Sequence, residues 1–253
     1  MNLSVYATVA ELQGAMPWGS VLDAGTGRGS MRWMLSLQTT RWTAVTGSRR
    51  MAEATRNEIG DRQRPQDQLV VGNWVDGELL AGEVYDTVLA DYLLGAVDGF
   101  APYWQDRLFA RLKSHVGKRL YVVGLEPYVL QSPGDPAGRV INEIGRLRDA
   151  CLLLSRDRPY REYPLDYVLR HLVLAGFKVL DAQTLPIRYG ERFINSQIDL
   201  CLESIGRMQD RSPAASLLMH AAGVRERALA LSAAEGGLRY GNDYIVVAES
   251  QSR

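Results

Sequence analysis

Three alternating glycines are the feature of this sequence with the clearest chemical meaning. The segment Val21–Gly29 has the sequence VLDAGTGRG, in which Gly25, Gly27 and Gly29 follow an apolar run that ends in Asp23. Glycines let a backbone turn sharply and approach a ligand without a Cβ atom in the way, and the start of the following helix offers unpaired N–H groups. Such a turn between a strand and a helix is typical of a site for a nucleotide-like ligand.

The spacing of these glycines argues against two common classes of nucleotide site. A dinucleotide fingerprint is Gly-x-Gly-x-x-Gly/Ala, whereas Ser30 stands at its last position here. The phosphate-loop pattern Gly-x-x-x-x-Gly-Lys-Ser/Thr occurs nowhere in the sequence. The spacing therefore favours a ligand other than a dinucleotide or a nucleoside triphosphate held by a phosphate loop.

The segments that must position this turn indicate an α/β fold. Short apolar runs alternate with longer segments of helical periodicity, which predicts a mostly parallel, seven-stranded sheet with helices on both faces. We expect a single domain over residues 1–253, with a partly helical acceptor-side or lid region at about 131–176 and a helical insertion at about 190–237 before the last strand. The expected strands are 20–23, 42–46, 68–71, 85–90, 120–124, 177–182 and 243–248, and the expected helices are 30–37, 51–59, 103–112, 139–154, 164–175, 194–208 and 212–235.

Composition narrows the class of protein. Lys+Arg and Asp+Glu are both 29, so the formal net charge is zero, and we expect no dedicated nucleic-acid face. The sequence starts without a basic region and an apolar run, and no apolar stretch approaches 18 residues, so we expect no signal peptide and no membrane span. Cys151 and Cys201 are predicted to be buried, reduced thiols of a cytoplasmic protein. The histidines His115, His171 and His220 are scattered, and no metal site is expected.

The segment Val21–Gly29 resembles the first motif of class I S-adenosylmethionine (SAM)-dependent methyltransferases. The resemblance extends from about Ser20 to Ala182, plus the terminal strand, and it implies a Rossmann-like three-layer sandwich. It also implies that Asp23 lies near the methionine amino group of SAM. The turn Gly25-Thr26-Gly27 with Gly29 is then expected to pass beneath the ribose and the methionine.

Two later segments fit the same family. Asn73 and Trp74 follow the third strand, where the family often carries residues that contact the adenine. Asn73 is expected to hydrogen-bond the exocyclic amine, and Trp74 to stack on the ring. Asp91 and Tyr92 follow the fourth strand and are expected to face the transferable methyl group, with Asp91 contacting the cofactor as well.

One feature departs from the family pattern. The family usually ends its second strand with an acid that binds both ribose hydroxyls, whereas this sequence has Thr46-Gly47-Ser48-Arg49-Arg50. Ser48 is the candidate for a weaker ribose hydrogen bond. Arg49 and Arg50 would suit a phosphorylated ribose, so an NADP-dependent reductase stays an alternative, although they also fit a solvated helix start.

The acceptor site is expected at the segments after the fourth and fifth strands. These are Asp91-Tyr92, 98–100 and Leu125-Glu126-Pro127-Tyr128. Glu126 and Tyr128 are the favoured acid/base or orienting pair, together with Asp91 and Tyr92 as candidate catalytic residues. The motif Asn-Pro-Pro-Tyr of several amino-methylating relatives is absent, which weakens the case for nucleobase or glutamine methylation.

The sequence thus predicts a methyltransferase that uses SAM on a small-molecule N, O or S nucleophile. A protein or RNA methyltransferase and a non-catalytic adenosyl-ligand-binding protein remain alternatives. Apolar positions of the insertion, namely Leu217, Leu218, Leu229 and Leu231, suit either a homodimer contact or core packing.

Overall fold

A computed structural model describes residues 3–251, and it divides the chain into two compact units. The sheet unit comprises the chain up to Leu125, Glu162–Leu185 and the chain from Asp243. The helical unit comprises Glu126–Arg161 and Pro186–Asn242. The expected insertion at 190–237 and most of the expected lid region fall in the helical unit, and the single-domain organisation of residues 1–253 stays a prediction.

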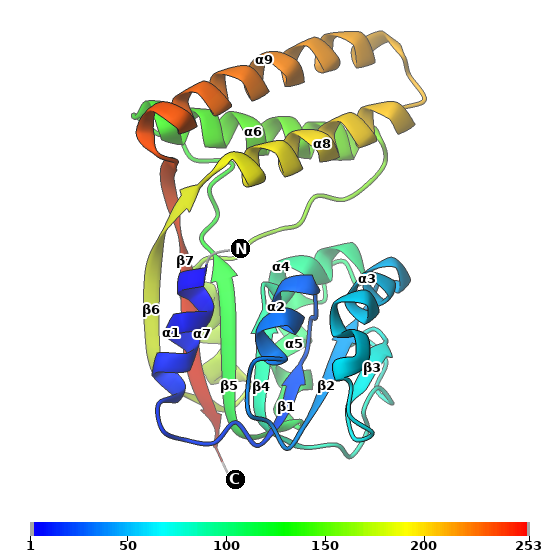
Figure 1. The fold of residues 1–253 in the computed structure, drawn as a ribbon, viewed down its shortest axis with the longest axis vertical. Helices are drawn as coiled ribbons and strands as arrows, with labels where there is room; N and C mark the ends of the chain where they lie inside the picture. The colour runs from blue at the N-terminus through cyan, green and yellow to red at the C-terminus, as the bar shows by residue number, and fades with distance from the viewer. Residues whose placement is uncertain (1–2, 252–253) are drawn as a thin grey trace. The chain divides into compact units, whose positions relative to one another are not determined.

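The sheet has seven strands in the order β3-β2-β1-β4-β5-β7-β6 (Figure 1). Strands β1 to β5 pair in parallel, and β7 runs antiparallel to β5, which confirms the mostly parallel sheet expected from the sequence. The strands are β1 (Ser20–Asp23), β2 (Arg41–Thr46), β3 (Gln68–Val71), β4 (Tyr85–Asp91), β5 (Val116–Leu125), β6 (Phe177–Tyr189) and β7 (Leu238–Ser250).

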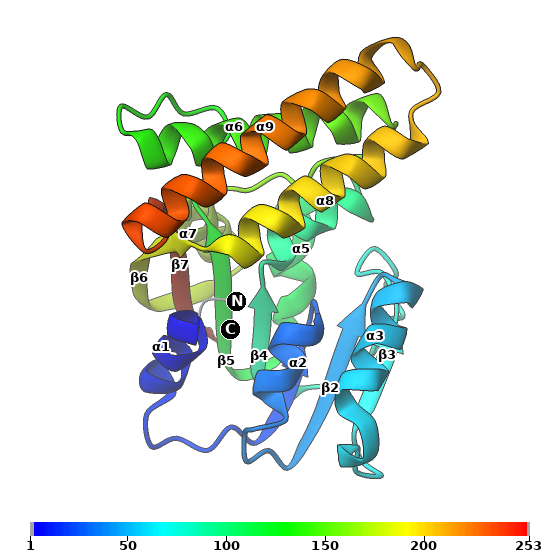
Figure 2. The same cartoon turned by 45° about the horizontal axis from the view of Figure 1, so that its top comes forward.

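Helices cover both faces of the sheet, as expected (Figure 2). One face packs against α1 (Leu3–Gln13), α2 (Arg28–Met34) and α3 (Arg49–Ile59), and we call it the α1 face. The other packs against α4 (Leu93–Ala96), α5 (Gln105–Lys113) and α7 (Leu165–Leu174). Two 3-10 turns, η1 (Gly60–Arg62) and η2 (Val97–Gly99), complete these connections.

The register of the sheet brings three acids to the edge formed by the carboxyl ends of the parallel strands. Asp23 ends β1 and pairs with Leu89, so Asp91 stands two residues further along β4. Because β7 is antiparallel, its residue Asp243 pairs with Leu125, the last residue of β5. Side chains alternate along a strand, and Val21, Leu89 and Ile245 all pack on the α1 face. Asp23, Asp91 and Asp243 therefore lie on that same face, at the edge where β1, β4 and β5 end.

Several elements differ from the expectation, because helices α1 and α4 were not expected and strands β5, β6 and β7 are longer than expected. Helix α1 is absent from the expected elements, because Leu3–Gln13 carries no acidic first turn and no basic last turn to mark it; burial of Val5 and Val9 against the sheet holds it in place. Strand β6 continues past Pro186, which an edge strand tolerates because its outer N–H groups need no partner. Strand β7 begins at Leu238, five residues before the expected start.

The helical unit consists of α6 (Pro136–Leu154), α8 (Glu191–Arg207) and α9 (Ser212–Glu235), which pack on one another. Asp135 caps α6 by accepting a hydrogen bond from Gly138 N at 2.7 Å, and Gly236 ends α9 in the left-handed conformation, as its sequence predicts. In residues 3–251 every helix is too short or too polar to cross a membrane.

Candidate functional site

The glycine turn is fixed to both neighbouring strands. Ala24 N donates to Leu89 O of β4 at 2.8 Å, and Thr26 N donates to Val45 O of β2 at 2.7 Å. Gly27 is the N-cap of α2, and its N–H donates to Ser30 Oγ at 3.1 Å. A Cβ atom at Gly27 would meet nothing within 4 Å, so the backbone there faces open space. Gly29 lies in the first turn of α2.

The carboxyl group of Asp23 is fully buried behind this turn. Its Oδ1 accepts a long hydrogen bond from Gly25 N at 3.4 Å, while its Oδ2 has no partner. Burial raises the pKa of Asp23 to about 6, against the opposing effect of hydrogen bonds from Ser30, Thr26 and Gly25. A buried carboxylate oxygen without a partner is costly, and a ligand that donates a hydrogen bond would relieve that cost.

Asp91 is in a similar state at the end of β4. Tyr6 of α1 donates its hydroxyl to Asp91 Oδ2 at 2.7 Å, while Asp91 Oδ1 is buried without a partner. Burial, followed by the charges of Asp23 and Asp243, raises the pKa of Asp91 to about 7, and the Tyr6 hydrogen bond opposes that rise. The register of β1 and β4 places Asp23 and Asp91 at the same end of neighbouring strands, and the charge of Asp23 contributes to the raised pKa of Asp91.

Tyr92 links the end of β4 to β7. Its backbone is in the left-handed region at φ 48°, and its hydroxyl donates to Asp243 Oδ1 at 2.8 Å. Burial and the charge of Asp243 raise the pKa of Tyr92 well above its ordinary range. Asp243 is itself buried, with 3% of its surface exposed. We call Asp23, Asp91 and Asp243 the acid layer.

Asn73 and Trp74, predicted to contact the adenine, both form hydrogen bonds within the protein. Trp74 is buried, and its indole N–H donates to Ala24 O of the glycine turn at 2.7 Å. The ring also packs against His115, so Trp74 supports the glycine turn, and its stacking on adenine stays a prediction. Asn73 Nδ2 donates to Phe100 O at 2.9 Å, and its Oδ1 accepts from Val75 N.

The end of β2 is occupied by a helix cap and an aromatic ring. Ser48 is the N-cap of α3, and its hydroxyl accepts from Met51 N at 3.2 Å. Phe100 lies over Gly47, where an added Cβ atom would come within 2.7 Å of the ring. Ser48 thus already has a structural role, and the segment 47–50 that follows β2 contains no acid.

Glu126 and Tyr128 belong to the helical unit, whereas Asp91 and Tyr92 belong to the sheet unit. Tyr128 is buried beside Tyr189 and Tyr240, and its carbonyl accepts from Asn142 Nδ2 at 2.7 Å. These contacts make Tyr128 part of the packing of the helical unit.

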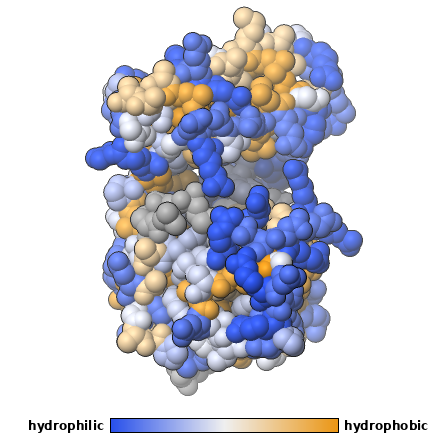
Figure 3. Space-filling model, in the orientation of Figure 1, coloured by the Kyte–Doolittle hydropathy of each residue, from blue (hydrophilic) through white to orange (hydrophobic). Residues whose placement is uncertain are grey.

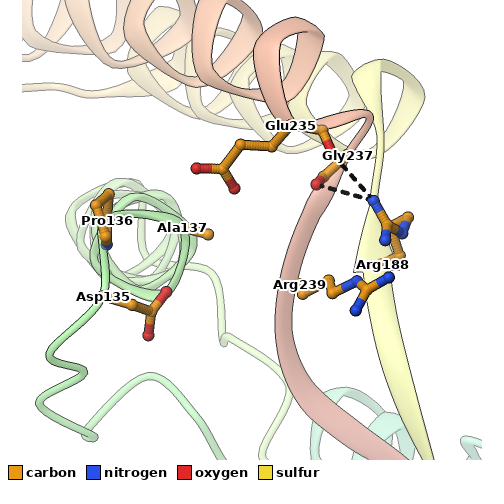
Figure 4. Close-up of a pocket in the computed structure, with 7 residues that line it drawn as sticks. All are labelled: Asp135, Pro136, Ala137, Arg188, Glu235, Gly237 and Arg239. Carbon is orange, nitrogen blue, oxygen red and sulfur yellow. Dashed lines mark hydrogen bonds between the residues drawn. The ribbon is translucent and has the colours of Figure 1, made fainter.

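A surface cavity of about 400 Å³ lies in the helical unit, and none of the residues that line it is a predicted site residue. Figure 4 shows Arg188 reaching the carbonyls at the end of α9, which it caps. The residues that line the cavity are Asp135, Pro136, Ala137, Arg188, Glu235, Gly237 and Arg239. In the described part of the chain, no group of three or more His, Cys, Asp or Glu side chains is arranged to hold a metal ion.

Two residues of the site were missed by the sequence analysis. Asp243 opens the last expected strand, and an antiparallel last strand would have brought it to this edge. Tyr6 lies 85 residues from its partner Asp91 and in an element without a clear helix signal, so nothing local identifies it.

Comparison with solved structures identifies the fold. The structure aligns with BH2331, a candidate methyltransferase of Bacillus halodurans C-125, at a TM-score of 0.59 and 15% identity over 99% of both chains. It aligns with coclaurine N-methyltransferase, bound to N-methylheliamine and S-adenosylhomocysteine (SAH), at a TM-score of 0.55 and 14% identity over 98% of this chain and 72% of that one. The 4+2 cyclase SpnF aligns at a TM-score of 0.55 and 17% identity over 99% and 82%.

These likenesses, together with the strand order and the antiparallel β7, show the fold of the class I SAM-dependent methyltransferases. No protein-family model matches the sequence. No curated protein matches it either. The fold also occurs in a cyclase, so activity has to be argued from the site.

Proposed function

We propose that this chain is a SAM-dependent methyltransferase that acts on a small-molecule N, O or S nucleophile. The observation that carries the proposal is the pair of buried carboxylate oxygens without partners, Asp23 Oδ2 and Asp91 Oδ1, beside an open glycine turn in this fold. An ammonium group supplies the positive charge and the N–H donors that a buried carboxylate requires.

The methionine end of SAM fits the residues present. Asp23 would accept from its ammonium group, and the turn Gly25-Thr26-Gly27 with Gly29 would lie along the ligand, since Gly27 faces open space. The adenosine end of SAM would have fewer polar contacts than the methionine end. Ser48 and Asn73 would supply them, and each would have to break or share the hydrogen bond that it forms within the protein. Bound SAM supplies a methyl group on a sulfonium centre, which needs an aligned nucleophile more than covalent help.

The chain's own contribution to the reaction would be orientation and proton handling. Asp91, with a pKa near 7, is suited to take up or release a proton near neutral pH. Tyr92 would orient the acceptor beside it, held by its hydrogen bond to Asp243. The roles proposed from sequence for Glu126 and Tyr128 as an acid/base or orienting pair stay predictions.

Calorimetry with SAM and SAH tests this proposal. We expect both to bind, and we expect Asp23→Asn to weaken binding at least ten-fold. Asp86→Asn is the matched control, because Asp86 lies on β4 near its other end, where it binds Lys118 Nζ at 2.8 Å and Ser20 N at 2.8 Å. Absence of binding by either ligand at millimolar concentration would falsify the proposal.

A second candidate is an adenosyl-ligand-binding protein that transfers no methyl group. The missing ribose acid and the use of Ser48 as a helix cap favour it, and the same fold serves the cyclase SpnF. Retention of SAH by the purified protein, with no methyl transfer to any compound of a cell extract supplied with labelled SAM, would select this candidate.

The proposal extends to the setting of the protein. We place it in the cytoplasm, where the buried thiols of Cys151 and Cys201 would stay reduced. Its partner would be a small-molecule acceptor, and the protein would have no dedicated nucleic-acid face and no contact with a membrane. A homodimer stays a prediction; on α9, Leu218 and Met219 are exposed. Figure 3 shows hydrophobic residues among hydrophilic ones on the surface of the helical unit. Light scattering in solution would measure the oligomeric state.

A further inference from the structure

We propose that the acceptor is an amine, and that its nitrogen binds Asp91 Oδ1 beside the Tyr92–Asp243 pair. This inference rests on the proposed function and names the substrate class for it. It starts from the acid layer, which combines three carboxylates at one edge and on one face of the sheet.

Two residues of the acid layer, Asp23 and Asp91, have no cationic side chain beside them among residues 3–251. Among residues 3–251, Asp23 and Asp91 form no ion pair with a lysine, arginine or histidine, and each keeps one buried oxygen without a partner. The layer is not arranged as a metal site within that same range. Burying such negative charge without a partner is unfavourable, so a cationic hydrogen-bond donor is the ligand that fits.

The two unpartnered oxygens stand at different positions along the sheet. Asp23 is level with Leu89, so Asp91 lies two residues, or roughly 6–7 Å, further along β4. Asp23 sits directly behind the glycine turn and is assigned to the cofactor. Asp91 lies on β4, the neighbour of β5, and is influenced by Asp243 from β7. A second cationic nitrogen, from the acceptor, therefore suits Asp91.

The chemistry of the site disfavours acidic acceptors such as phenols. Tyr6 and Tyr92 are phenols bonded to this layer, and burial together with the nearby carboxylates raises the pKa of each far above its ordinary range. A phenol or thiol acceptor would have to lose its proton and form an anion against the same charges. An amine gains from those charges, because it arrives as a cation.

The proton step balances on this chain's own residues. The protonated amine transfers H⁺ to the Asp91 carboxylate, so that one N–H bond breaks and one O–H bond forms on Oδ1. The nitrogen keeps the electron pair of the broken bond and becomes a nucleophile, and Asp91 becomes neutral. A carboxyl group with a pKa near 7 can hold that proton and return it to water after each turnover.

Binding of matched amines and alcohols tests this inference without relying on activity. Ligand-observed NMR on the SAH-saturated full chain would screen a library in which each amine is paired with the hydroxyl compound of the same shape. We expect the compounds that bind to be predominantly amines. Asp91→Asn should weaken their binding at least ten-fold while changing SAH affinity less than three-fold, and Asp243→Asn should weaken them in the same direction. Asp86→Asn, a carboxylate loss at the far end of β4, should leave amine binding unchanged.

Three results would overturn the inference while leaving the methyltransferase proposal intact. These are SAH binding with no preference for amines, amine binding that survives Asp91→Asn, and a loss of SAH affinity in Asp91→Asn as large as that in Asp23→Asn. The last would assign Asp91 to the cofactor alone. If SAH fails to bind, the proposed function fails, and the same screen on the free protein still decides whether Asp91 selects amines.

Discussion

Tyr6 of α1 donates its hydroxyl to Oδ2 of Asp91 at the end of β4, at a distance of 2.7 Å. The ring of Tyr6 is stacked on Trp33 of α2, with centroids 4.9 Å apart and planes 13° from parallel, so its position is well defined. The first helix of the chain is thereby tied to the acid layer. Among residues 3–251, this is the one hydrogen bond to the Asp91 carboxylate, and its removal should have a pH-dependent cost.

We predict that Tyr6→Phe lowers the free energy of unfolding by about 1–3 kcal/mol at pH 8 and by less at pH 5. The pKa of Asp91 is raised from 3.8 to about 7 in the folded state. The buried Asp91 side chain is therefore most compatible with the folded state when it is protonated. Its contribution to the free energy of unfolding is present in full below pH 3.8 and is lost as the pH rises through 7. At pH 8 the variant buries a charged carboxylate without any partner, whereas at pH 5 the group is neutral. Urea unfolding at both pH values measures the difference.

Tyr121→Phe is the control for this prediction. The Tyr121 hydroxyl donates to Gln13 Oε1 of the same helix α1 at 2.5 Å, and that acceptor carries no charge in this range. Its removal should cost the same at pH 5 and pH 8. Equal pH dependence in the two variants would contradict the role assigned to the Tyr6–Asp91 bond.

Trp74→Phe tests the position of the indole below the glycine turn. The variant leaves Ala24 O without its 2.7 Å partner and makes the buried side chain smaller, so stability should fall by about 1–3 kcal/mol. Because Trp74 is buried and its indole is bonded to Ala24 O, we expect any change in tryptophan fluorescence caused by SAH to persist in the variant. Loss of that change, with SAH still bound, would restore the stacking role that the sequence suggested.

Elements whose limits are set by local patterns could be predicted from the sequence. Strands β1 and β3 begin and end at the expected residues, because apolar runs bounded by turn residues identify them, and α9 ends at the expected glycine pair. Asp23 and Asp91 could be placed at one edge because parallel strands end together.

The remaining features depend on contacts between distant segments. Trp74 follows a strand end, and only tertiary packing decides whether its ring faces a ligand or the turn 50 residues away. Helix α1 has weak local signals and is held by burial against the sheet, so Tyr6 could not be predicted. Likewise, Ser48 was expected to serve a ribose, but its hydroxyl caps α3, a role that the same residue type fills in many helices.

Ser48→Asp should supply the missing ribose acid without harming the fold. Aspartate is as good an N-cap as serine, and a negative charge at a helix N-terminus is favourable, so stability should change by less than about 1 kcal/mol. The second carboxylate oxygen is then available to a ribose hydroxyl, and we expect SAH affinity to rise about ten-fold. Ser48→Ala is the matched comparison: it should cost about 0.5–2 kcal/mol of stability and lower SAH affinity, the opposite direction to Ser48→Asp. Calorimetry and thermal unfolding measure both, and unchanged affinity in Ser48→Asp would place the ribose elsewhere.

Gly27→Ala separates the role of the turn in binding from its role in folding. Gly27 has φ −128° and ψ 177°, extended backbone that alanine also adopts, and a Cβ atom there would meet no protein atom within 4 Å. The fold should therefore lose less than about 1 kcal/mol. A ligand lying along the turn would meet the new methyl group, so we expect SAH affinity to fall about ten-fold or more.

Gly25→Ala is the matched variant with the opposite balance, because its Cβ atom would lie 2.9 Å from Leu93 Cδ1. It should destabilise the protein itself by about 1–3 kcal/mol, and this cost should be smaller when Gly25→Ala is introduced into the Leu93→Ala variant, where the clash is absent. Thermal unfolding and SAH calorimetry on the three variants distinguish the two glycines. If Gly27→Ala binds SAH as well as the natural chain does, the ligand does not approach the turn at Gly27, and the open space there has another explanation than a cofactor cradle.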